Sequence, residues 1–427
     1  MAFAWISPNT FTAFSSSSND RIDLWKIPKF RVHPSSAGIL NCSCKCESNS
    51  SDNGLKFVLH DALDSSGIDT THARAAREGF CSQIQKLSDI ERETSTRVNE
   101  DVDLGRAALH IAAEDDSLIS HSSVPLPVDD FLFRLDSLAV EYCSRYGSSL
   151  RSSPEDFLEC LNRYLYVNKA FRRSSARNQV EQRALYLNSV LTHRSGSVPM
   201  LSLIYSEILK MLRLWGVLNF DVEIFFPHDS YGSPSCYHKQ ESKESDQPDV
   251  MASQALLVEI LQDLKHAFWP FQLDHARSLF LRAAYAAHCY NGSSENKESA
   301  LELASAKAAR HRLQRGVWTS VRFGDIRRAL SACERLILLQ IDPKELRDYA
   351  ALLYHCGFYV ESLQYLKLYQ DKKESPTFDL KSRLASNLEE DEAVEKLIIR
   401  LNLILMEEGW CRQSDNRSAL FNNTEPW

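Results

Sequence analysis

No segment of this 427-residue sequence is long and apolar enough to cross a membrane as a helix. Such a helix needs about eighteen or more apolar residues in succession, and polar residues interrupt every run well before that length. An excess of positive charge is also missing, because the formal net charge is −8. We therefore expect no membrane span and no general binding to nucleic acid, although a local basic face stays compatible with this charge. The chain has 44% hydrophobic and 25% charged residues, which is typical of globular domains, and its length favours two or three of them.

Paired cysteine and histidine clusters at the spacing of a zinc site are missing as well. The sequence has 11 cysteines, but only Cys42, Cys44 and Cys46 lie close together. Because no second cluster follows nearby, we expect no metal site and no cofactor; a metal or redox site at these three residues is the alternative. The scattered thiols favour a reducing compartment in which most of them are buried.

Charged residues are missing from Met1 to Asn19, a segment rich in Ser, Thr and Phe. Basic residues then outnumber acidic ones up to Arg31. This composition is typical of an organelle transit peptide, and the Met-Ala start with abundant Ser favours a plastid. A secretory signal is disfavoured because no compact apolar segment follows a basic start. We expect a plastid transit peptide over residues 1–45, a location in the chloroplast stroma, and a disordered lead-in over residues 46–72.

In most of the remaining chain, apolar residues recur at helical spacing. Helices are predicted around residues 73–93, 104–113, 131–142, 157–165, 256–268 and 277–289. Ser153 and Pro154 supply a cap and a first residue for the fourth of these segments. A strand is predicted at 221–226, where Val222 and Ile224 alternate with acidic neighbours, and the hydrophilic segment 230–253 after it predicts an exposed loop.

The most strongly patterned segment runs from Ala184 to Gly216. Breaker residues from Ser195 to Pro199 predict a turn that leads into a mostly buried helix. Apolar residues then recur at spacings of three and four, at Leu201, Ile204, Ile208, Leu212 and Trp215. Gly216 follows at the position where a C-terminal cap belongs.

This segment resembles the core-helix motif of the SirB-type, transglutaminase-like family. That family has an Asn-x-Val-Leu, an Arg-x-Gly and a Pro before a Ser-Leu helix that ends in Gly. The matching residues are Asn188, Val190, Leu191, Arg194, Gly196, Pro199, Ser202, Leu203 and Gly216. Two spacings differ slightly from the family pattern, between Gly196 and Pro199 and before Gly216.

The resemblance implies the family's fold without its nucleophile. In transglutaminase-like enzymes a cysteine follows the Gly at the start of the helix, where the helix dipole and free amides lower a thiol's pKa and can hold an oxyanion. This sequence has Val198 there. His228 is the nearest match to the family's base, but the adjoining Gly is missing and Asp229 replaces a Phe. We assign no catalytic residue and regard Val198 and His228 as degenerate positions of a domain over residues 73–290.

Two further stretches of this domain match the family. The helix at 104–113 matches one that precedes an acidic loop, which predicts a loop at Glu114, Asp115 and Asp116. The run Asn162–Leu165 and Phe171 match a second motif, in which Ala170 replaces a family Gly.

The C-terminal part of the chain repeats itself. Gly324 and the Ala-Leu that follows it are echoed by Gly357 and a Ser-Leu, 33 residues later. This resembles the tetratricopeptide repeat of 34 residues, in which each unit is a pair of helices. The polar segment 291–299 predicts a domain boundary, and we expect helical repeats over 298–410 and a flexible tail over 411–427. The predicted helices are 301–322, 325–340, 344–355, 359–369 and 390–408. The second unit also matches the C-terminal part of the SirB-type family, at Arg347, Asp348, Leu353, Tyr354, Gly357, Tyr359, Ser362 and Leu363.

Basic residues gather on the first helix of this repeat. The candidates for binding a partner are Lys307, Arg310, His311, Arg312, Arg315 and Arg322. They could receive an acidic peptide, a carboxylate C-terminus or an RNA backbone, and an ordinary solvated helix face is the alternative. RNA is the weaker of these readings because aromatic residues are not interleaved with the basic ones, apart from Trp318.

Together these observations favour a mainly α protein, with a degenerate transglutaminase-like α+β domain followed by a short tetratricopeptide-like repeat domain. We expect a non-catalytic scaffold or adaptor that binds protein clients in the plastid stroma, and the sequence leaves its oligomeric state open. The first alternative is a thiol hydrolase or acyltransferase with a relocated nucleophile. Its candidates are Cys143, Cys160, Cys236 and Cys289, each predicted in a helix interior or an exposed loop and not at a helix start after a Gly turn. Ser197 and Ser202 are substitute nucleophiles without a sequence partner that would activate them. The second alternative is RNA binding through the basic face.

Overall fold

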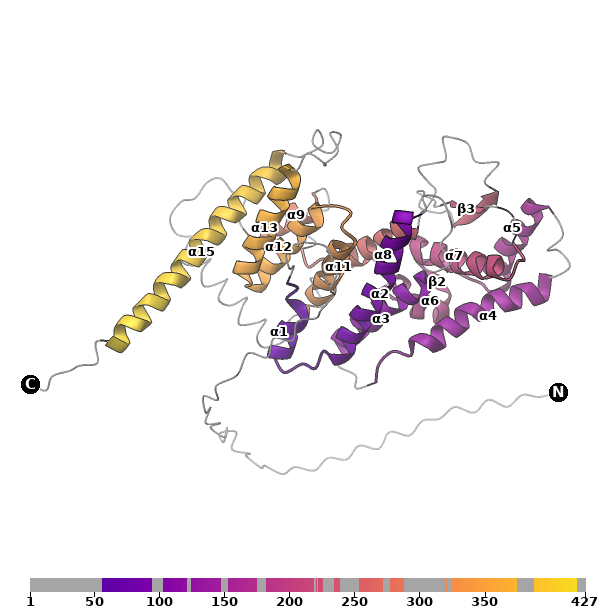
Figure 1. Ribbon diagram of the computed structural model, residues 1–427, viewed down its shortest axis with the longest axis horizontal. Coiled ribbons are helices and arrows are strands. Elements are labelled where there is room, and N and C mark those ends of the chain that lie inside the picture. The colour runs from indigo at the N-terminus through magenta and orange to yellow at the C-terminus, as the bar shows by residue number, and fades with distance from the viewer. Residues whose placement is uncertain are drawn as a thin grey trace, which may run out of the picture. The chain divides into compact units, whose positions relative to one another are not determined.

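Helices account for most of the structure, a computed structural model that describes most of the chain beyond residue 55 (Figure 1). The described residues are 56–93, 103–120, 124–146, 153–174, 182–218, 220, 222–225, 234–238, 253–271, 277–287, 319–320, 324–374 and 388–420. The expected transit peptide over 1–45 lies outside them, so it stays a prediction.

The first half of the described chain is helical, with short strands between the helices. Its helices are α1 (Leu59–Ser65), α2 (Thr71–Glu93), α3 (Leu104–Ser120), α4 (Val128–Tyr146), α5 (Pro154–Asn162), the π-helix η2 (Arg163–Asn168), the 3₁₀ turn η3 (Gln182–Leu185), α6 (Leu187–His193) and α7 (Val198–Leu214). The strands β1 (Arg172–Arg173) and β2 (Ser195–Gly196) pair in parallel, and β3 (Val222–Phe225) pairs antiparallel with β4 (Ser235–His238).

The second half is helical too. It contains α8 (Ser253–Phe268), α9 (Leu279–Ala286), the short antiparallel pair β5 (Thr319–Ser320) and β6 (Gly324–Asp325), α11 (Ile326–Leu339), α12 (Lys344–Cys356), α13 (Tyr359–Glu374) and α15 (Leu388–Leu420). The helices predicted at 325–340, 344–355, 359–369 and 390–408 are therefore present, and the last two extend further. The predicted helix at 301–322 lies outside the described residues.

The predicted central helix is confirmed as α7. Its core positions Leu201, Ile204, Ile208 and Leu212 are each at most 3% exposed. Gly216 has a φ of +69°, and the Val217 amide donates to the Leu212 carbonyl at 2.9 Å, which is the hydrogen bond that closes a Schellman C-cap. Trp215, also predicted to be buried, is 43% exposed because the helix has already ended there.

Three predictions about irregular segments are corrected. The lead-in expected to be disordered up to residue 72 contains α1, where Leu59 and Leu63 are buried. The loop expected over 230–253 contains β4, whose register is fixed by pairing with β3. The tail expected from residue 411 continues α15 to Leu420. Contacts with other elements hold the first two of these segments, since Leu59 and Leu63 are buried and β4 is paired with β3.

Helices from both expected domains share one hydrophobic core, which runs from Val58 to Ile404. α8 packs against α7 on one side and α11 on the other, and α3 contacts both α7 and α11. In Figure 1, α3 and α8 lie between the helices α4–α7 and the helices α11–α13. The expected boundary at 291–299 lies outside the described residues, and the tetratricopeptide assignment stays a prediction.

Candidate functional site

The entrance to α7 is the place where the transglutaminase-like resemblance predicts a nucleophile. Ser197 precedes the helix in an extended conformation (φ −66°, ψ 163°), and its amide donates to the Ala184 carbonyl at 2.9 Å. Pro199 occupies the first turn, where its missing amide hydrogen costs nothing. The Pro and the extended Ser explain locally why the helix begins at Val198.

Two features fix this entrance tightly. Gly196 leaves no room for a side chain, because a Cβ built there would lie 2.9 Å from Val190 Cγ1 and 3.3 Å from Leu201 Cδ2. Arg194 just before it adopts a left-handed conformation (φ 58°) and donates from Nη1 to the Lys169 carbonyl at 2.6 Å. The Arg-x-Gly motif therefore fixes the conformation of the backbone that leads into α7.

Val198 is buried at this entrance, with 6% of its surface exposed. Its side chain offers methyl groups where a nucleophile would need sulfur or oxygen, so this position supplies no covalent chemistry. Ser197 is the cap residue and its side chain accepts no capping hydrogen bond. Ser202 is fully buried, with its hydroxyl inside the core.

The alternative of a thiol enzyme with a relocated nucleophile depends on the cysteines elsewhere in the chain. Burial raises the pKa of Cys143, and it raises the pKa of the fully buried Cys333 and Cys356. A raised pKa lowers the thiolate fraction, which is the opposite of what a nucleophile needs. Cys160 is half-buried in α5, Cys236 lies in β4, and Cys289 lies outside the described residues.

Several predicted site residues fall outside the described part of the chain. These are His228 and the basic candidates Lys307, Arg310, His311, Arg312, Arg315 and Arg322. Their roles stay predictions. Among the residues that the structure describes, no cluster of His, Cys, Asp and Glu side chains has the geometry to hold a metal ion. No helix in the same described ranges is long and apolar enough to span a bilayer.

The motif at Asn162–Leu165 forms the junction between α5 and the π-helix η2. Tyr164 is fully buried and donates its hydroxyl to the Leu138 carbonyl of α4 at 2.9 Å. Tyr205 of α7 donates to Asn162 Oδ1. These contacts hold α4, α5 and α7 together, so the motif acts in packing.

A buried network of ion pairs centres on Glu114, at a position predicted to be a loop. That prediction is wrong: α3 continues to Ser120, and Glu114 and Asp115 are at most 1% exposed. Arg77 of α2 donates two hydrogen bonds to Glu114, from Nε to Oε2 at 2.8 Å and from Nη2 to Oε1 at 2.6 Å. Arg335 of α11 donates to Glu114 Oε2 at 3.2 Å and to Asp115 Oδ1 at 2.6 Å.

Further side chains complete this network. His60 of α1 lies 3.1 Å from Glu114 Oε1, and the Ser331 hydroxyl donates to the same oxygen at 2.9 Å. Tyr186 donates its hydroxyl to Asp115 Oδ2 at 2.7 Å. Arg77 also pairs with Glu334 of α11 at 2.9 Å. We call this set the α3–α11 network: His60, Arg77, Glu114, Asp115, Tyr186, Ser331, Glu334 and Arg335.

The two central carboxylates of the α3–α11 network have opposite pKa shifts. Burial alone would raise the pKa of Glu114, but Arg335 and Arg77 outweigh it and hold that pKa well below its usual range. Burial raises the pKa of Asp115, and Arg335 opposes this only in part because Glu114 lies beside it. Glu114 is therefore the ionised partner on which the arginines converge.

A second buried network links α8, α12 and α15. Lys265 Nζ lies 2.7 Å from Glu345 Oε2 and 3.1 Å from Asp348 Oδ2. Arg347 pairs with two acids: its Nη2 lies 3.1 Å from Asp348 Oδ1, and its Nη1 lies 2.7 Å from Glu390 Oε2 of α15. Burial raises the pKa of Glu345 to about 7, with Lys265 opposing it.

Both networks pair their buried charges within the chain and tie distant helices together, although Arg335 Nη1 has no hydrogen-bond partner among the described residues. Paired and buried charges of this kind specify how helices dock rather than binding a ligand. Sequence reasoning missed them because the partners are far apart: Arg335 and Asp115 are separated by 220 residues. The one sequence signal was the adjacent acidic triplet beginning at Glu114, which is unusual inside an apolar helix.

Comparison with known families finds one match. Residues 129–216 match the model of the transglutaminase-like superfamily. The matched segment runs from α4 to the Gly216 cap of α7 and contains Val198. No curated protein and no solved structure is similar enough to this chain to count as a match.

Proposed function

Residues 129–216 form a transglutaminase-like domain, and from that premise we propose that the chain is a non-catalytic scaffold that binds protein clients in the chloroplast stroma. Two facts support the proposal. The fold is associated with acyl chemistry, and the first residue of α7 is a valine, which cannot act as the nucleophile of that chemistry. The location follows from the composition of residues 1–45.

The observation that carries the proposal is Val198. Its position is the first residue of α7, and its side chain is buried. The neighbouring groups Gly196, Ser197 and Pro199 keep the helix entrance in place, so the backbone of the site is retained while its nucleophile is replaced. A retained backbone with an inert side chain supports a binding role for the domain.

The candidates for client binding are the basic residues Lys307, Arg310, His311, Arg312, Arg315 and Arg322. Arginine recognises carboxylates with two parallel hydrogen bonds, so an acidic segment or a C-terminal carboxylate of the client is the preferred ligand class.

A thiol-reactivity assay tests the absence of catalysis. The full chain is treated with an electrophilic thiol probe at a mildly acidic pH, and labelling of each of the 11 cysteines is followed by mass spectrometry. We expect no cysteine to react faster than a free thiol. Fast labelling of one cysteine that disappears in His228→Ala would replace the scaffold with the thiol-enzyme alternative; the denatured chain is the control for complete labelling.

Affinity capture tests the binding role. The full chain and a variant with Lys307→Glu, Arg310→Glu and Arg315→Glu are used as baits in stromal extract. We expect a reproducible acidic client with the first bait and its loss with the second. Recovery of RNA instead, with a steep dependence on salt, would favour the RNA-binding alternative. Identical client sets from both baits would remove the basic residues from the proposal.

A further inference from the structure

The chain around the entrance of α7 is basic, although the chain as a whole is acidic. From Leu161 to Ser206 the sequence has seven Lys and Arg residues and one acidic residue, Glu181. Over the full length, 57 acidic residues outnumber 49 basic ones. A local excess of positive charge in a chain of opposite net charge concentrates positive potential on one part of the surface.

Backbone pairing gathers three arginines of this segment at one place. The Arg172 amide donates to the Arg194 carbonyl at 2.9 Å, and the Ser174 amide donates to the Gly196 carbonyl at 2.9 Å. These bonds run along the pairing of β1 with β2. Arg172 and Arg173 therefore lie beside the strand that Arg194 precedes, just before α7 begins.

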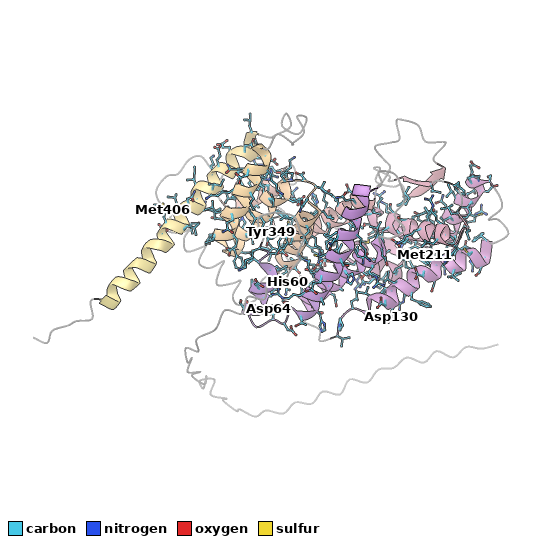
Figure 2. The ribbon with its side chains drawn as sticks, in the orientation of Figure 1. His60, Asp64, Asp130, Met211, Tyr349 and Met406 are labelled. Atoms are coloured by element: carbon cyan, nitrogen blue, oxygen red, sulfur yellow. The ribbon has the colours of Figure 1, made fainter. Side chains whose placement is uncertain are left out.

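A fourth arginine comes to the same place from η3. The Ser197 amide donates to the Ala184 carbonyl at 2.9 Å, which holds the neighbouring Arg183 close to the start of α7. In Figure 1, β2 and α6 lie together next to α7. Met211, which Figure 2 labels, lies near the other end of this helix. We call Arg172, Arg173, Arg183 and Arg194 the entrance arginines.

The entrance arginines are accessible from solvent. Arg172, Arg183 and Arg194 are exposed, and Arg173 is half-buried. Arg172 and Arg183 form no ion pair with any residue that the structure describes. Arg194 donates from Nη1 to the Lys169 carbonyl, which carries no charge. Positive charge at this surface is therefore open to an anion from outside the chain.

Glu141 of α4 reports the sign of the local potential. It pairs with Lys169 and Arg145. The hydrogen bond from Lys169 and the charges of Lys169 and nearby arginines hold the pKa of the Glu141 carboxyl below its usual range. This acid is already bound by other cations, so it does not neutralise Arg172 or Arg183.

The chemistry of this surface favours an acidic protein segment. A planar guanidinium donates two parallel hydrogen bonds to one carboxylate, so several arginines can bind several carboxylates at once. Single-stranded RNA would need exposed aromatic side chains on which its bases stack, and the net charge of −8 repels a long polyanion. The aromatic residues of the basic segment are all buried or half-buried: Tyr164, Tyr166, Phe171, Tyr186 and Tyr205.

We propose that the entrance arginines bind an acidic segment of a protein client, whose carboxylates pair with Arg172, Arg183 and Arg194. This inference rests on the proposed scaffold function and assigns a client site to the transglutaminase-like domain itself. The site is separate from the basic candidates between Lys307 and Arg322.

Direct binding of an acidic peptide tests the proposal. A fluorescein-labelled oligoglutamate peptide is titrated with the full chain at low salt, and its fluorescence anisotropy is followed. We expect saturable binding that weakens as the salt concentration rises, because salt screens exposed charges. Arg172→Glu combined with Arg183→Glu should weaken this binding about tenfold or more.

Two further variants control for net charge and for folding. Lys367→Glu combined with Lys372→Glu makes the same change in net charge at exposed positions of α13, and it should leave binding unchanged. Arg172→Gln combined with Arg183→Gln removes the charges without adding new ones and should weaken binding by a smaller factor. All variants should keep the circular dichroism spectrum of the natural chain.

Three results would overturn the proposal. One is the absence of saturable peptide binding by the full chain. Another is equal weakening by the arginine variant and by the lysine control, since net charge alone would then explain the binding. The third is a single-stranded RNA that binds more tightly than the peptide and is lost in the arginine variant, which would make the surface a phosphate site.

Capture from stromal extract separates this inference from the scaffold proposal. A chain that captures a client but does not bind the peptide rejects the entrance arginines and leaves the scaffold in place. Peptide binding that the arginine variant loses, in a chain that captures no client, supports the arginine site and rejects the scaffold.

Discussion

Ala170 adopts a backbone conformation that is unfavourable for alanine. It follows the π-helix η2 and has a φ of 55°, in the left-handed region that favours glycine. The SirB-type family, which this sequence resembles, has Gly at the corresponding position. Because a Cβ in this conformation approaches the backbone, alanine costs about 1 kcal/mol there.

We predict that Ala170→Gly stabilises the protein by about 1 kcal/mol, measured as the free energy of unfolding in denaturant. Ala75→Gly, at an exposed position inside α2, is the control and is expected to destabilise, since glycine weakens the interior of an ordinary helix. An Ala170→Gly variant that is less stable than the natural chain would contradict the strain argument.

Glu207 is a buried acid with a capping role. Its Oε1 accepts from the amides of Leu104 and Gly105 at the start of α3, at 3.1 and 3.3 Å. Burial raises its pKa to about 7, with Lys210 opposing the shift. Between its ordinary value of 4.5 and about 7, the folded state keeps a proton that the unfolded state has lost, so this group makes stability fall as the pH rises.

We therefore predict that Glu207→Gln removes this fall, because glutamine keeps the acceptor and does not ionise. Relative to the natural chain, the variant should gain about 1 to 3 kcal/mol between about pH 5 and about pH 8. Denaturant unfolding at both pH values measures this, and Glu159→Gln, an exposed acid in α5, is the control. A pH dependence that is unchanged by Glu207→Gln would contradict the assignment.

At the scale of elements, local sequence predicted α7 well because its signals lie within the helix. Breaker residues precede it, apolar residues recur along one face, and a glycine ends it. The same reasoning failed for the end of α3. Three acidic residues in succession indicate a solvated loop unless cations reach them, and those cations come from α2 and α11.

The entrance of α7 provides a prediction for an element. Gly196→Ala forces a methyl group to within 2.9 Å of Val190 Cγ1, and we expect it to destabilise the protein by about 1 to 3 kcal/mol. Thermal unfolding followed by circular dichroism is the measurement. Adding Val190→Ala removes the clashing methyl groups and should make the alanine at position 196 less harmful; a purely additive loss would argue against this contact as the cause.

At the scale of the molecule, the α3–α11 network joins the N-terminal helices to the helices expected to form a separate repeat domain. Arg335 is fully buried, and its guanidinium contacts both Glu114 and Asp115. Removing one partner of a buried ion pair leaves the other charge uncompensated, which costs about 3 to 5 kcal/mol.

We predict that Arg335→Leu destabilises the protein by about that amount and that unfolding stays a single transition. Far-ultraviolet circular dichroism and tryptophan fluorescence should therefore give coincident curves. Arg74→Leu is the control, because Arg74 pairs with Asp61 and Asp64 at partly exposed positions and its loss should cost little. Two separate transitions would show that the expected domains unfold independently.

The sequence by itself determined the positions of most helices, the cap at Gly216 and the valine at the start of α7, because periodicity, cap chemistry and residue identity are local properties. Only the tertiary structure decided that α1 is ordered, that β4 pairs with β3, and that Glu114 and Asp115 are buried inside a helix. Those outcomes depend on partners as far as 220 residues away. A charge can be buried only where its counter-charge arrives, and folding alone brings such partners together.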